Sequence, residues 1–351
     1  MTVLRWLDSR RTGVAAALGA AVLFGAGTPL AKWLLGALSP WLLAGLLYLG
    51  AGLGLMIYRV LRKAPAARLP RSQVPWLVGA IVAGGVVGPV LLMFGLNGLP
   101  ASNTALLLNA EGVFTALLAW FAFKENFDRR IALGMLSIVA GVVVLSWPDE
   151  LRLAAGWPAL AVLGACLAWA IDNNLTRKVA LSDAAWIASI KGLVAGSVNL
   201  LLALWLGASL PPSANLAAAL LVGFFAYGVS LALFVVGLRH LGTARTGAYF
   251  SAAPFVGALL ALLLGESPTP TLALAGALMG LGLWLHLTER HEHAHTHDAL
   301  EHDHPHRHDE HHTHEHETEV APGIAHHHRH RHAAVRHTHA HFPDAHHRHD
   351  H

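Results

Sequence analysis

The chain has 351 residues, of which 54% are hydrophobic and only 13% are charged, and its mean hydropathy is +0.49. Such an apolar composition is typical of a membrane protein. The formal net charge of +3 hides a split, because residues 1–290 carry a net +9, whereas residues 291–351 carry a net −6 and 24 of the 26 histidines. The basic pI of about 9.2 therefore belongs to the apolar part and does not indicate nucleic-acid binding.

The N-terminal residues predict a retained membrane helix. Residues 1–11 contain Arg5, Arg10 and Arg11 and lead directly into a long apolar stretch. That stretch lacks an early small-residue cleavage site, so we expect a cytoplasmic N-terminus and a first helix rather than a signal peptide. The single cysteine, Cys166, excludes a disulfide framework and a thiolate metal cluster within one chain.

Apolar segments long enough to cross a bilayer recur along the chain. A helix of roughly 20 apolar residues spans the ~30 Å hydrocarbon core and satisfies its own backbone hydrogen bonds. Turn residues such as Ser39-Pro40 and Pro211-Pro212 separate the segments. We therefore predict an all-α membrane fold with ten transmembrane helices. The predicted spans are 12–33, 39–58, 74–95, 101–123, 130–147, 157–178, 184–206, 214–237, 244–264 and 270–288.

The positions of Lys and Arg predict the orientation, because these residues resist translocation. With the N-terminus inside, sixteen basic residues fall on the cytoplasmic side, whereas the outer connections contain only Arg152. We therefore expect a multi-pass protein of the bacterial cytoplasmic membrane with both termini in the cytoplasm. The cytoplasmic basic residues are Arg5, Arg10, Arg11, Arg59, Arg62, Lys63, Arg68, Arg71, Lys124, Arg129, Arg130, Arg177, Lys178, Arg239, Arg245 and Arg290.

The sequence contains an internal repeat. Leu18-Gly19-Ala20 recurs as Leu163-Gly164-Ala165, and Thr104 corresponds to Thr246. Because each half holds five predicted spans, the second half must be inverted relative to the first. Inverted repeats are common in secondary transporters, whose substrate site lies at the repeat interface. The predicted division is an N-terminal segment 1–11, repeats 12–147 and 157–288, and a tail 289–351.

The fourth and ninth spans carry a resemblance to a known family. The first pattern runs from Leu99 through Phe114-Thr115-Ala116-Leu117 to Glu125, and the second from Leu241-Gly242-Thr243-Ala244 to Leu264-Gly265-Glu266. Duplicated at this spacing, they resemble the EamA-type branch of the drug/metabolite transporter superfamily. The first half departs from the family pattern, because it lacks the mid-helix proline that the second half has at Pro254. The closest resemblance is to histidine-tailed members associated with nickel and cobalt resistance.

Charged and amide side chains inside the apolar segments are the candidates for the transport path. Such residues are costly in a membrane and are by default functional. For Glu111, the alternatives are a cation or proton site and a structural carboxylate paired with Lys191 or Lys32. For Asp172, they are a cation site and a solvated acid beside Arg177. Lys191 could contact substrate or form a salt bridge to Asp172 or Glu111. The complete candidate set is Glu111, Asp172, Lys191, Asn109, Asn199 and Lys32.

The histidine-rich tail predicts metal binding. Neutral imidazoles bind nickel, cobalt and zinc, and a flexible chain can gather several around one ion. The tail has too few apolar residues to form a core, so we expect it to be disordered. It could serve transport or act as a passive buffer. The predicted ligands are His291, His293, His295, His297, His302, His304, His306, His308, His326, His327, His328 and His330.

Together these features predict a secondary transporter rather than an enzyme. We expect it to export a small solute, with a divalent transition metal such as nickel or cobalt as first choice and the tail as its collector. One alternative is an exporter of amino acids, drugs or other organic metabolites with a regulatory tail, and another is a membrane metal sensor or buffer. The expected partners are membrane lipid and the solute, with no nucleic acid. GxxxG pairs such as Gly50–Gly54 would also allow a homodimer, although packing within the chain is the preferred interpretation.

Overall fold

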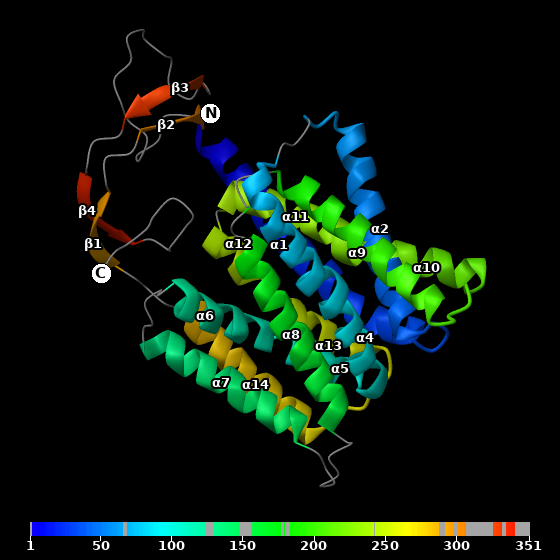
Figure 1. The fold of residues 1–351 in the computed structure, drawn as a ribbon. Helices are drawn as coiled ribbons and strands as arrows, with labels where there is room; N and C mark the ends of the chain where they lie inside the picture. The colour runs from blue at the N-terminus through cyan, green and yellow to red at the C-terminus, as the bar shows by residue number, and fades with distance from the viewer. Residues whose placement is uncertain are drawn as a thin grey trace. The chain divides into compact units, whose positions relative to one another are not determined.

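A computed structural model describes residues 2–65, 69–123, 129–147, 156–176, 179, 183–241 and 243–287, and four short strands between Glu292 and Ala340. The chain divides into two compact units, Met1–Thr288 and Glu289–His351. The first unit is a bundle of helices (Figure 1). The described part of the second contains only strands as regular elements.

The helices of the first half follow the predicted spans. Apolar side chains run through each of them, so their burial and not an isolated amphipathic stripe stabilises the bundle. The elements are α1 (Thr2–Leu34), α2 (Pro40–Leu61), a short 3₁₀ turn (Arg71–Gln73), α3 (Val74–Ala80), a π-helical segment (Ile81–Val87), α4 (Gly88–Gly98), α5 (Ala101–Leu107), α6 (Ala110–Phe123) and α7 (Arg129–Ser146).

The helices of the second half repeat this order. A second π-helical segment again divides the third helical stretch. The elements are α8 (Trp157–Thr176), α9 (Ala184–Trp205), α10 (Ser213–Gly223), the π-helical segment Phe224–Val229, α11 (Ser230–Leu241), α12 (Thr243–Phe250), α13 (Ala253–Leu263) and α14 (Pro270–Leu287). α7 and α14, the last helices of the two halves, lie side by side (Figure 1).

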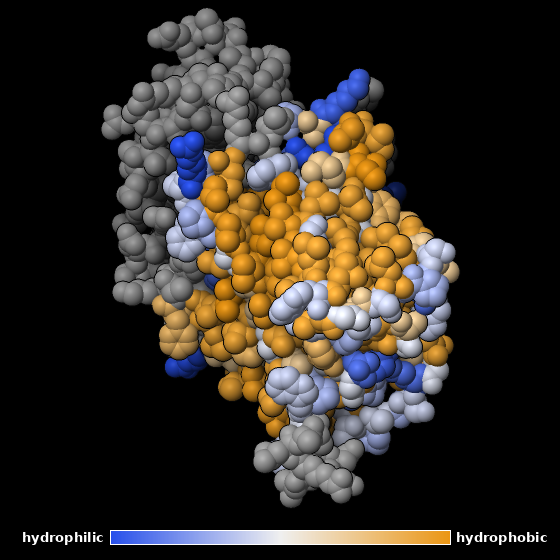
Figure 2. All heavy atoms as spheres, turned by 45° about the vertical axis from the view of Figure 1, so that its right-hand side comes forward, coloured by the Kyte–Doolittle hydropathy of each residue, from blue (hydrophilic) through white to orange (hydrophobic). Residues whose placement is uncertain are grey.

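Six helical stretches in the described part of the chain are long and apolar enough to cross a membrane. Apolar residues cover the middle of the face shown in Figure 2, and hydrophilic residues lie toward its ends. The predicted helical fold is confirmed, whereas the count of ten crossings stays a prediction. The long stretches are Arg11–Leu34, Pro40–Leu61, Arg71–Gly98, Trp157–Thr176, Ala185–Trp205 and Ser213–Gly237, and the shorter apolar helices are Ala132–Ser146, Ala253–Leu263 and Pro270–Leu285.

The spans predicted over 101–123 and 244–264 are wrong as continuous helices. α5 ends at Leu107 and α6 begins at Ala110, while α12 ends at Phe250 and α13 begins at Ala253. Pro254, at the start of α13, explains the second break because it has no backbone N–H to donate. The first break needs no proline: the Asn109 side chain donates to the Leu106 carbonyl at 2.9 Å, which competes with continuing the helix. The two breaks correspond when Thr104 is aligned with Thr246.

The second helix of each half begins in the same way. Ser39 caps α2 by accepting a hydrogen bond from the Leu42 backbone N–H at 3.4 Å, and Asp183 caps α9 by accepting from Trp186 at 3.0 Å. The two helices then pack closely, because a Cβ added at Gly45 would lie 2.7 Å from the Leu200 nitrogen. The repeat read from the sequence therefore also appears in capping.

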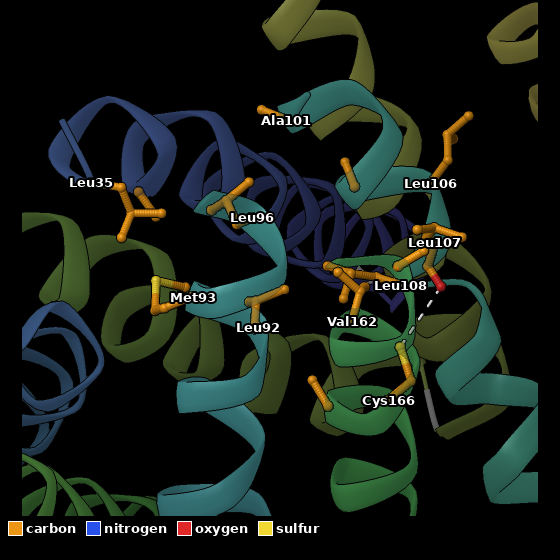
Figure 3. Packing of buried hydrophobic residues seen from close by; sticks show 14 of the residues in the cluster. Leu35, Leu92, Met93, Leu96, Ala101, Leu106, Leu107, Leu108, Val162 and Cys166 are labelled. Atoms are coloured by element: carbon orange, nitrogen blue, oxygen red, sulfur yellow. Dashed lines mark hydrogen bonds between the residues drawn. The ribbon is translucent and has the colours of Figure 1, made fainter. Parts of the chain in front are cut away.

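The GxxxG glycines contact helices of the same chain. A Cβ at Gly50 would lie 2.2 Å from the Leu220 carbonyl oxygen, and one at Gly54 would lie 1.8 Å from a Phe224 ring carbon. These contacts support the preferred interpretation, packing within the chain. Figure 3 shows the core between helices α4, α5 and α8, where the Cys166 thiol donates a weak hydrogen bond to the Leu107 carbonyl at the end of α5.

The described part of the tail consists of strands, where the sequence predicted disorder. It contains strands β1 (Glu292–His297), β2 (Glu301–His306), β3 (His326–Arg331) and β4 (Val335–Ala340). β1 pairs with β4 and β2 with β3, both antiparallel. The prediction of disorder rested on the lack of an apolar core, but a two-stranded ladder is held by backbone hydrogen bonds. Such isolated ladders are only marginally stable in water.

The inverted orientation of the halves gives a prediction that labelling can test. Cysteines placed between Glu125 and Arg130 should react with impermeant reagents only from the cytoplasm, and cysteines between Glu266 and Pro270 only from outside. Opposite sides follow because an odd number of crossings separates the two loops. The measurement is thiol labelling in intact cells against inverted vesicles. Labelling of both loops from one side would contradict the inversion.

Candidate transport site

Asp172 and Lys191 form a buried ion pair between helices α8 and α9. The Lys191 ammonium lies 2.5 and 2.6 Å from the two carboxylate oxygens, and the side chains are only 9% (Asp172) and 17% (Lys191) exposed. Thr176, one turn further along α8, donates to the same carboxylate at 2.8 Å. The salt-bridge interpretation of Lys191 is therefore confirmed. A solvated Asp172 beside Arg177 is wrong, because α8 turns this carboxylate into the bundle; Arg177 itself lies outside the described residues.

Glu111 lies in the first turn of α6, directly after the break in the fourth span. Its carboxylate accepts a hydrogen bond from the Asn173 amide at 2.9 Å, and Asn173 also contacts the Thr115 hydroxyl at 3.4 Å. The hydrogen-bond partner of Glu111 is therefore a neutral amide rather than a lysine, while Lys191 interacts with this carboxylate electrostatically. Asn173 follows Asp172 on α8, so this helix carries one of the two carboxylates and donates a hydrogen bond to the other. Asn173 is exposed and a Cβ at Gly112 would meet no atom within 4 Å, so this edge of the site is open.

The first π-helical segment lies against the ion pair. A Cβ built on Gly84 would lie 1.9 Å from Asp172 Oδ2, so only glycine fits here. The Gly84 carbonyl accepts hydrogen bonds from the Tyr48 hydroxyl at 2.8 Å and the Trp169 ring nitrogen at 2.9 Å. Asn199, which is fully buried, donates to the next carbonyl, Gly85, at 3.1 Å. Asn199 and Asp172 therefore lie against neighbouring glycines of the same π-helical segment.

A row of aromatic rings leads from this cluster to the break between α12 and α13. Tyr48 lies 6.1 Å from Tyr227, Tyr227 lies 5.6 Å from Phe24, and Phe24 lies 5.3 Å from Phe250, measured between ring centroids. Phe250 is the last residue of α12, directly before the second helix break. Tyr48 also interacts electrostatically with Asp172 and Glu111. The row therefore connects the charged cluster, which both halves contribute, with the broken helix α12–α13 of the second half.

Two candidates lie outside the cluster. Asn109 follows α5, and its side-chain amide donates to the Leu106 carbonyl and lies 3.8 Å from the Met279 sulfur. Lys32 donates to the carbonyls of Leu96 at 2.7 Å and Asn97 at 3.1 Å, at the end of α4. An ammonium at a helix C-terminus interacts favourably with the helix dipole. These contacts support structural roles, and whether either residue lines the transport path stays a prediction.

The Glu266 carboxylate caps the start of α5, on the other side of the turn that follows α4. Glu266 accepts hydrogen bonds from the backbone N–H groups of Ala101 at 2.6 Å and Ser102 at 2.9 Å, at the start of α5. The turn between α4 and α5 therefore has a cation on its carbonyl end and an anion on its amide end. Lys32 comes from the first half and Glu266 from the second, so this contact joins the two repeats.

The predicted metal ligands lie in the tail. The backbone register places His293 opposite His339 and His295 opposite His337, while His302, His304 and His306 face His330, His328 and His326. His291 and His308 lie outside the described residues, and His327 is opposite Pro305. Where the structure describes side chains, which excludes the tail, no group of three His, Cys, Asp or Glu could hold a metal ion.

Two related helical halves, a broken helix in each, and charged groups beside the break define a class of protein: polytopic transporters built from repeats, whose substrates bind at the repeat interface. The chain belongs to the EamA-like transporter family, whose profile matches residues 11–147 and 156–288, one copy in each half. The resemblance found in the fourth and ninth spans is thereby confirmed. The protein is a membrane transporter of the drug/metabolite transporter superfamily.

The sequence and the fold are similar to those of known proteins whose names state no substrate. An uncharacterized transporter of Methanothermobacter thermautotrophicus is 28% identical over 277 residues, covering 74% of this chain and 81% of that protein. The uncharacterized inner membrane transporter YedA of Escherichia coli is 26% identical over 237 residues, or 64% of this chain and 74% of YedA. A solved crystal structure aligns with a TM-score of 0.60 at 21% identity, covering 79% of this chain and 96% of that one, and shows the fold alone.

Proposed function

We propose that this protein is a secondary exporter of a cytoplasmic membrane that moves a small solute by alternating access. The observation that carries the proposal is the cluster of Glu111, Asp172 and Lys191 beside a broken helix. Broken helices at a repeat interface form the substrate and ion sites of many secondary transporters. In this proposal, Glu111 exchanges a proton or contacts the solute, because the hydrogen bond that holds its carboxylate comes from the neutral Asn173 amide.

The first candidate cargo is a divalent transition metal such as nickel or cobalt. Its support is the tail, where 24 of the chain's 26 histidines follow the helical unit. The strand register places histidines opposite one another in five pairs, and paired strand residues are neighbours. The tail would collect the ion in the cytoplasm and raise its concentration near the transport path. Nickel, cobalt and zinc all accept imidazole ligands.

The second candidate cargo is an organic solute that carries an amine, such as an amino acid. Lys191 already neutralises Asp172, which leaves few free carboxylates for a divalent ion. The aromatic row through Tyr48, Tyr227 and Phe24 offers ring faces to a flat or cationic solute instead. Over 74 residues, 20% of this chain and 21% of the relative, the sequence is 35% identical to a protein named purine permease 2 from Arabidopsis thaliana. Both cargoes require Glu111 as the accessible carboxylate.

Two variants separate the tail from the membrane site. Glu111→Gln keeps the shape of the side chain but removes its charge, so it should lower maximal flux about ten- to a hundredfold, since a hydrogen bond to a charged group contributes about 1.5–3 kcal/mol. Deleting residues 291–351 should raise the metal concentration needed for half-maximal efflux but leave a maximal rate, because the tail cannot line a path through the bilayer. The measurement is transport of Ni²⁺, Co²⁺, Zn²⁺ and labelled amino acids in inverted vesicles at matched expression.

Glu150→Gln is the matched control, because it neutralises a carboxylate in a predicted outer loop and should transport like the wild type. Transport of amino acids without metals would replace the first cargo by the second. Loss of all flux on deleting the tail, together with normal flux in Glu111→Gln, would show that the membrane site is wrongly assigned. The absence of any flux in the wild type for every solute would leave both cargoes without support.

A further inference from the structure

The third helical stretch of each half contains a π-helical segment at a matching position. Ile81–Val87 interrupts the first, and Phe224–Val229 interrupts the second. The alignment that matches Thr104 with Thr246 places residues 224–229 opposite 82–87. π-helix accounts for well under 1% of residues in proteins and is frequent at functional sites. Two matched occurrences indicate a feature of the fold rather than a local irregularity.

Three side-chain donors form a polar tether on the first of these π-helical segments, and two of them have no donor at the matching position of the other half. A π turn shifts the backbone hydrogen bonding, and the carbonyls of Gly84 and Gly85 accept from three side chains: Tyr48, Trp169 and Asn199. In the other half, Phe24 corresponds to Trp169 when Leu18 is aligned with Leu163. Leu55 corresponds to Asn199 when the helix caps Ser39 and Asp183 are aligned. Neither of these side chains can donate a hydrogen bond. These side-chain hydrogen bonds therefore hold the π-helical segment Ile81–Val87, which is the one that contacts the Asp172–Lys191 ion pair.

The tether and the ion pair form a closed set of contacts. Asp172 lies against Gly84, and Trp169, three residues earlier on α8, holds the Gly84 carbonyl. On α9, Lys191 binds Asp172, while Asn199, eight residues further along the same helix face, holds Gly85. Neither α8 nor α9 can shift relative to the π-helical segment without straining both contacts. A change at the ion pair is thus mechanically linked to the third helical stretch, α3 to α4.

The role of Asn199 is to donate a hydrogen bond from its amide nitrogen, not to fill space. It is 0% exposed, and its side-chain oxygen is buried without a hydrogen-bond partner. A leucine would fill the same space without an unsatisfied acceptor, which is costly in an apolar interior. The amide nitrogen is the part that the fold uses, on the Gly85 carbonyl.

We propose that Asn199, with Tyr48 and Trp169, is a positioning residue of the transport site: it holds the π-helical segment Ile81–Val87 against Asp172 and so couples the Asp172–Lys191 pair to the third helical stretch. This inference rests on the proposed place of the ion pair in the transport path, but it is independent of the cargo. Asn199 acts through Gly85 and Asp172 and does not itself contact the solute.

The coupling can be measured without a substrate. Amide hydrogen exchange of residues 82–88 is recorded in the full chain, in lipid nanodiscs, for the wild type, Asn199→Leu, Asp172→Asn and the double variant. Each single change should speed exchange about tenfold, and the double variant should be about threefold or more slower than the product of the two, because linked sites are not additive. Ser230→Ala is the matched control: it removes another buried side-chain bond, from Ser230 to the Ala20 carbonyl. It should leave residues 82–88 unchanged.

Thr176→Val replaces Asp172→Asn if the latter does not fold, because it removes a hydrogen bond to Asp172 and keeps the charge. Exchange rates that multiply independently, or no effect of Asn199→Leu on residues 82–88, would overturn the inference. Non-additive exchange in a protein that transports normally without its ion pair would support the coupling and contradict the proposed function. The two failures are therefore distinguishable.

Discussion

Gly84→Ala is expected to reduce transport severely, because the added methyl carbon takes the place of the Asp172 carboxylate. The built Cβ lies 1.9 Å from Asp172 Oδ2 and 2.4 Å from its Cγ, closer than any real contact. Either the π-helical segment or α8 must move, and overpacking of this kind costs about 1–3 kcal/mol. If Asp172 moves, the Lys191 ammonium stays buried without its partner, and breaking a buried pair costs roughly 3–5 kcal/mol. We therefore expect a lower melting temperature and a flux reduced about a hundredfold.

Gly276→Ala is the matched control for this experiment. It is the same substitution on a helical glycine, but its Cβ would lie 3.5 Å from the Leu106 side chain, an ordinary contact. We expect it to melt and to transport like the wild type. The measurements are thermal unfolding in detergent and transport in inverted vesicles. Normal flux in Gly84→Ala would mean that Asp172 does not lie against Gly84 in the working protein.

The helices could be predicted because their signal is local. Each predicted span is a run of apolar residues ending at turn residues, and each coincides with one helix or with consecutive helices. The break at Leu108–Asn109 could not be predicted, because asparagine alone is compatible with a helix interior. It is fixed by the bond from Asn109 to the Leu106 carbonyl and by the Cys166 thiol on the Leu107 carbonyl. The second of these partners comes from another helix, so the sequence pattern does not contain it.

The charged part of the site could also be predicted, because an ionisable residue in an apolar segment stands out. This identified Glu111, Asp172 and Lys191, which the structure places together. Tyr48 and Trp169 could not be identified, because aromatic residues are ordinary in apolar helices. Their role comes from hydrogen bonds to Gly84, which lies 36 and 85 residues away along the chain.

Lys32 has contacts that the sequence could not predict. Like Lys191 it is a lysine within an apolar segment, so the same argument applied to both. The difference is where the ammonium ends: Lys191 reaches a buried carboxylate, whereas Lys32 reaches backbone carbonyls at the end of α4. A residue near the end of a span can satisfy its charge on a neighbouring helix terminus, and the sequence does not show which helix terminus lies beside it.

Removing both partners of the ion pair is expected to restore stability but not transport. Asp172→Asn leaves a buried ammonium and Lys191→Met leaves a buried carboxylate, so each single variant should lose roughly 3–5 kcal/mol of unfolding free energy. The double variant has no unpaired charge and should melt close to the wild type. If the pair lies in the transport path, the double variant should nevertheless show no flux. Wild-type flux in a stable double variant would make the pair a purely structural feature.

The single variant Lys191→Met also separates the two cargoes, provided that it folds. It leaves the Asp172 carboxylate without its ammonium and close enough to Glu111 for the two to interact electrostatically. Two unpaired carboxylates attract a divalent cation more strongly than one, so Ni²⁺ or Co²⁺ should bind this variant more tightly than the wild type. An amino acid carries a carboxylate of its own, which Lys191 would attract, and it should bind the same variant more weakly. Titration of the purified variant with each solute gives the direction of the change. Metal binding that tightens in the variant assigns the site to a metal ion, whereas amino-acid binding that weakens, with no metal binding in either protein, assigns it to the organic solute.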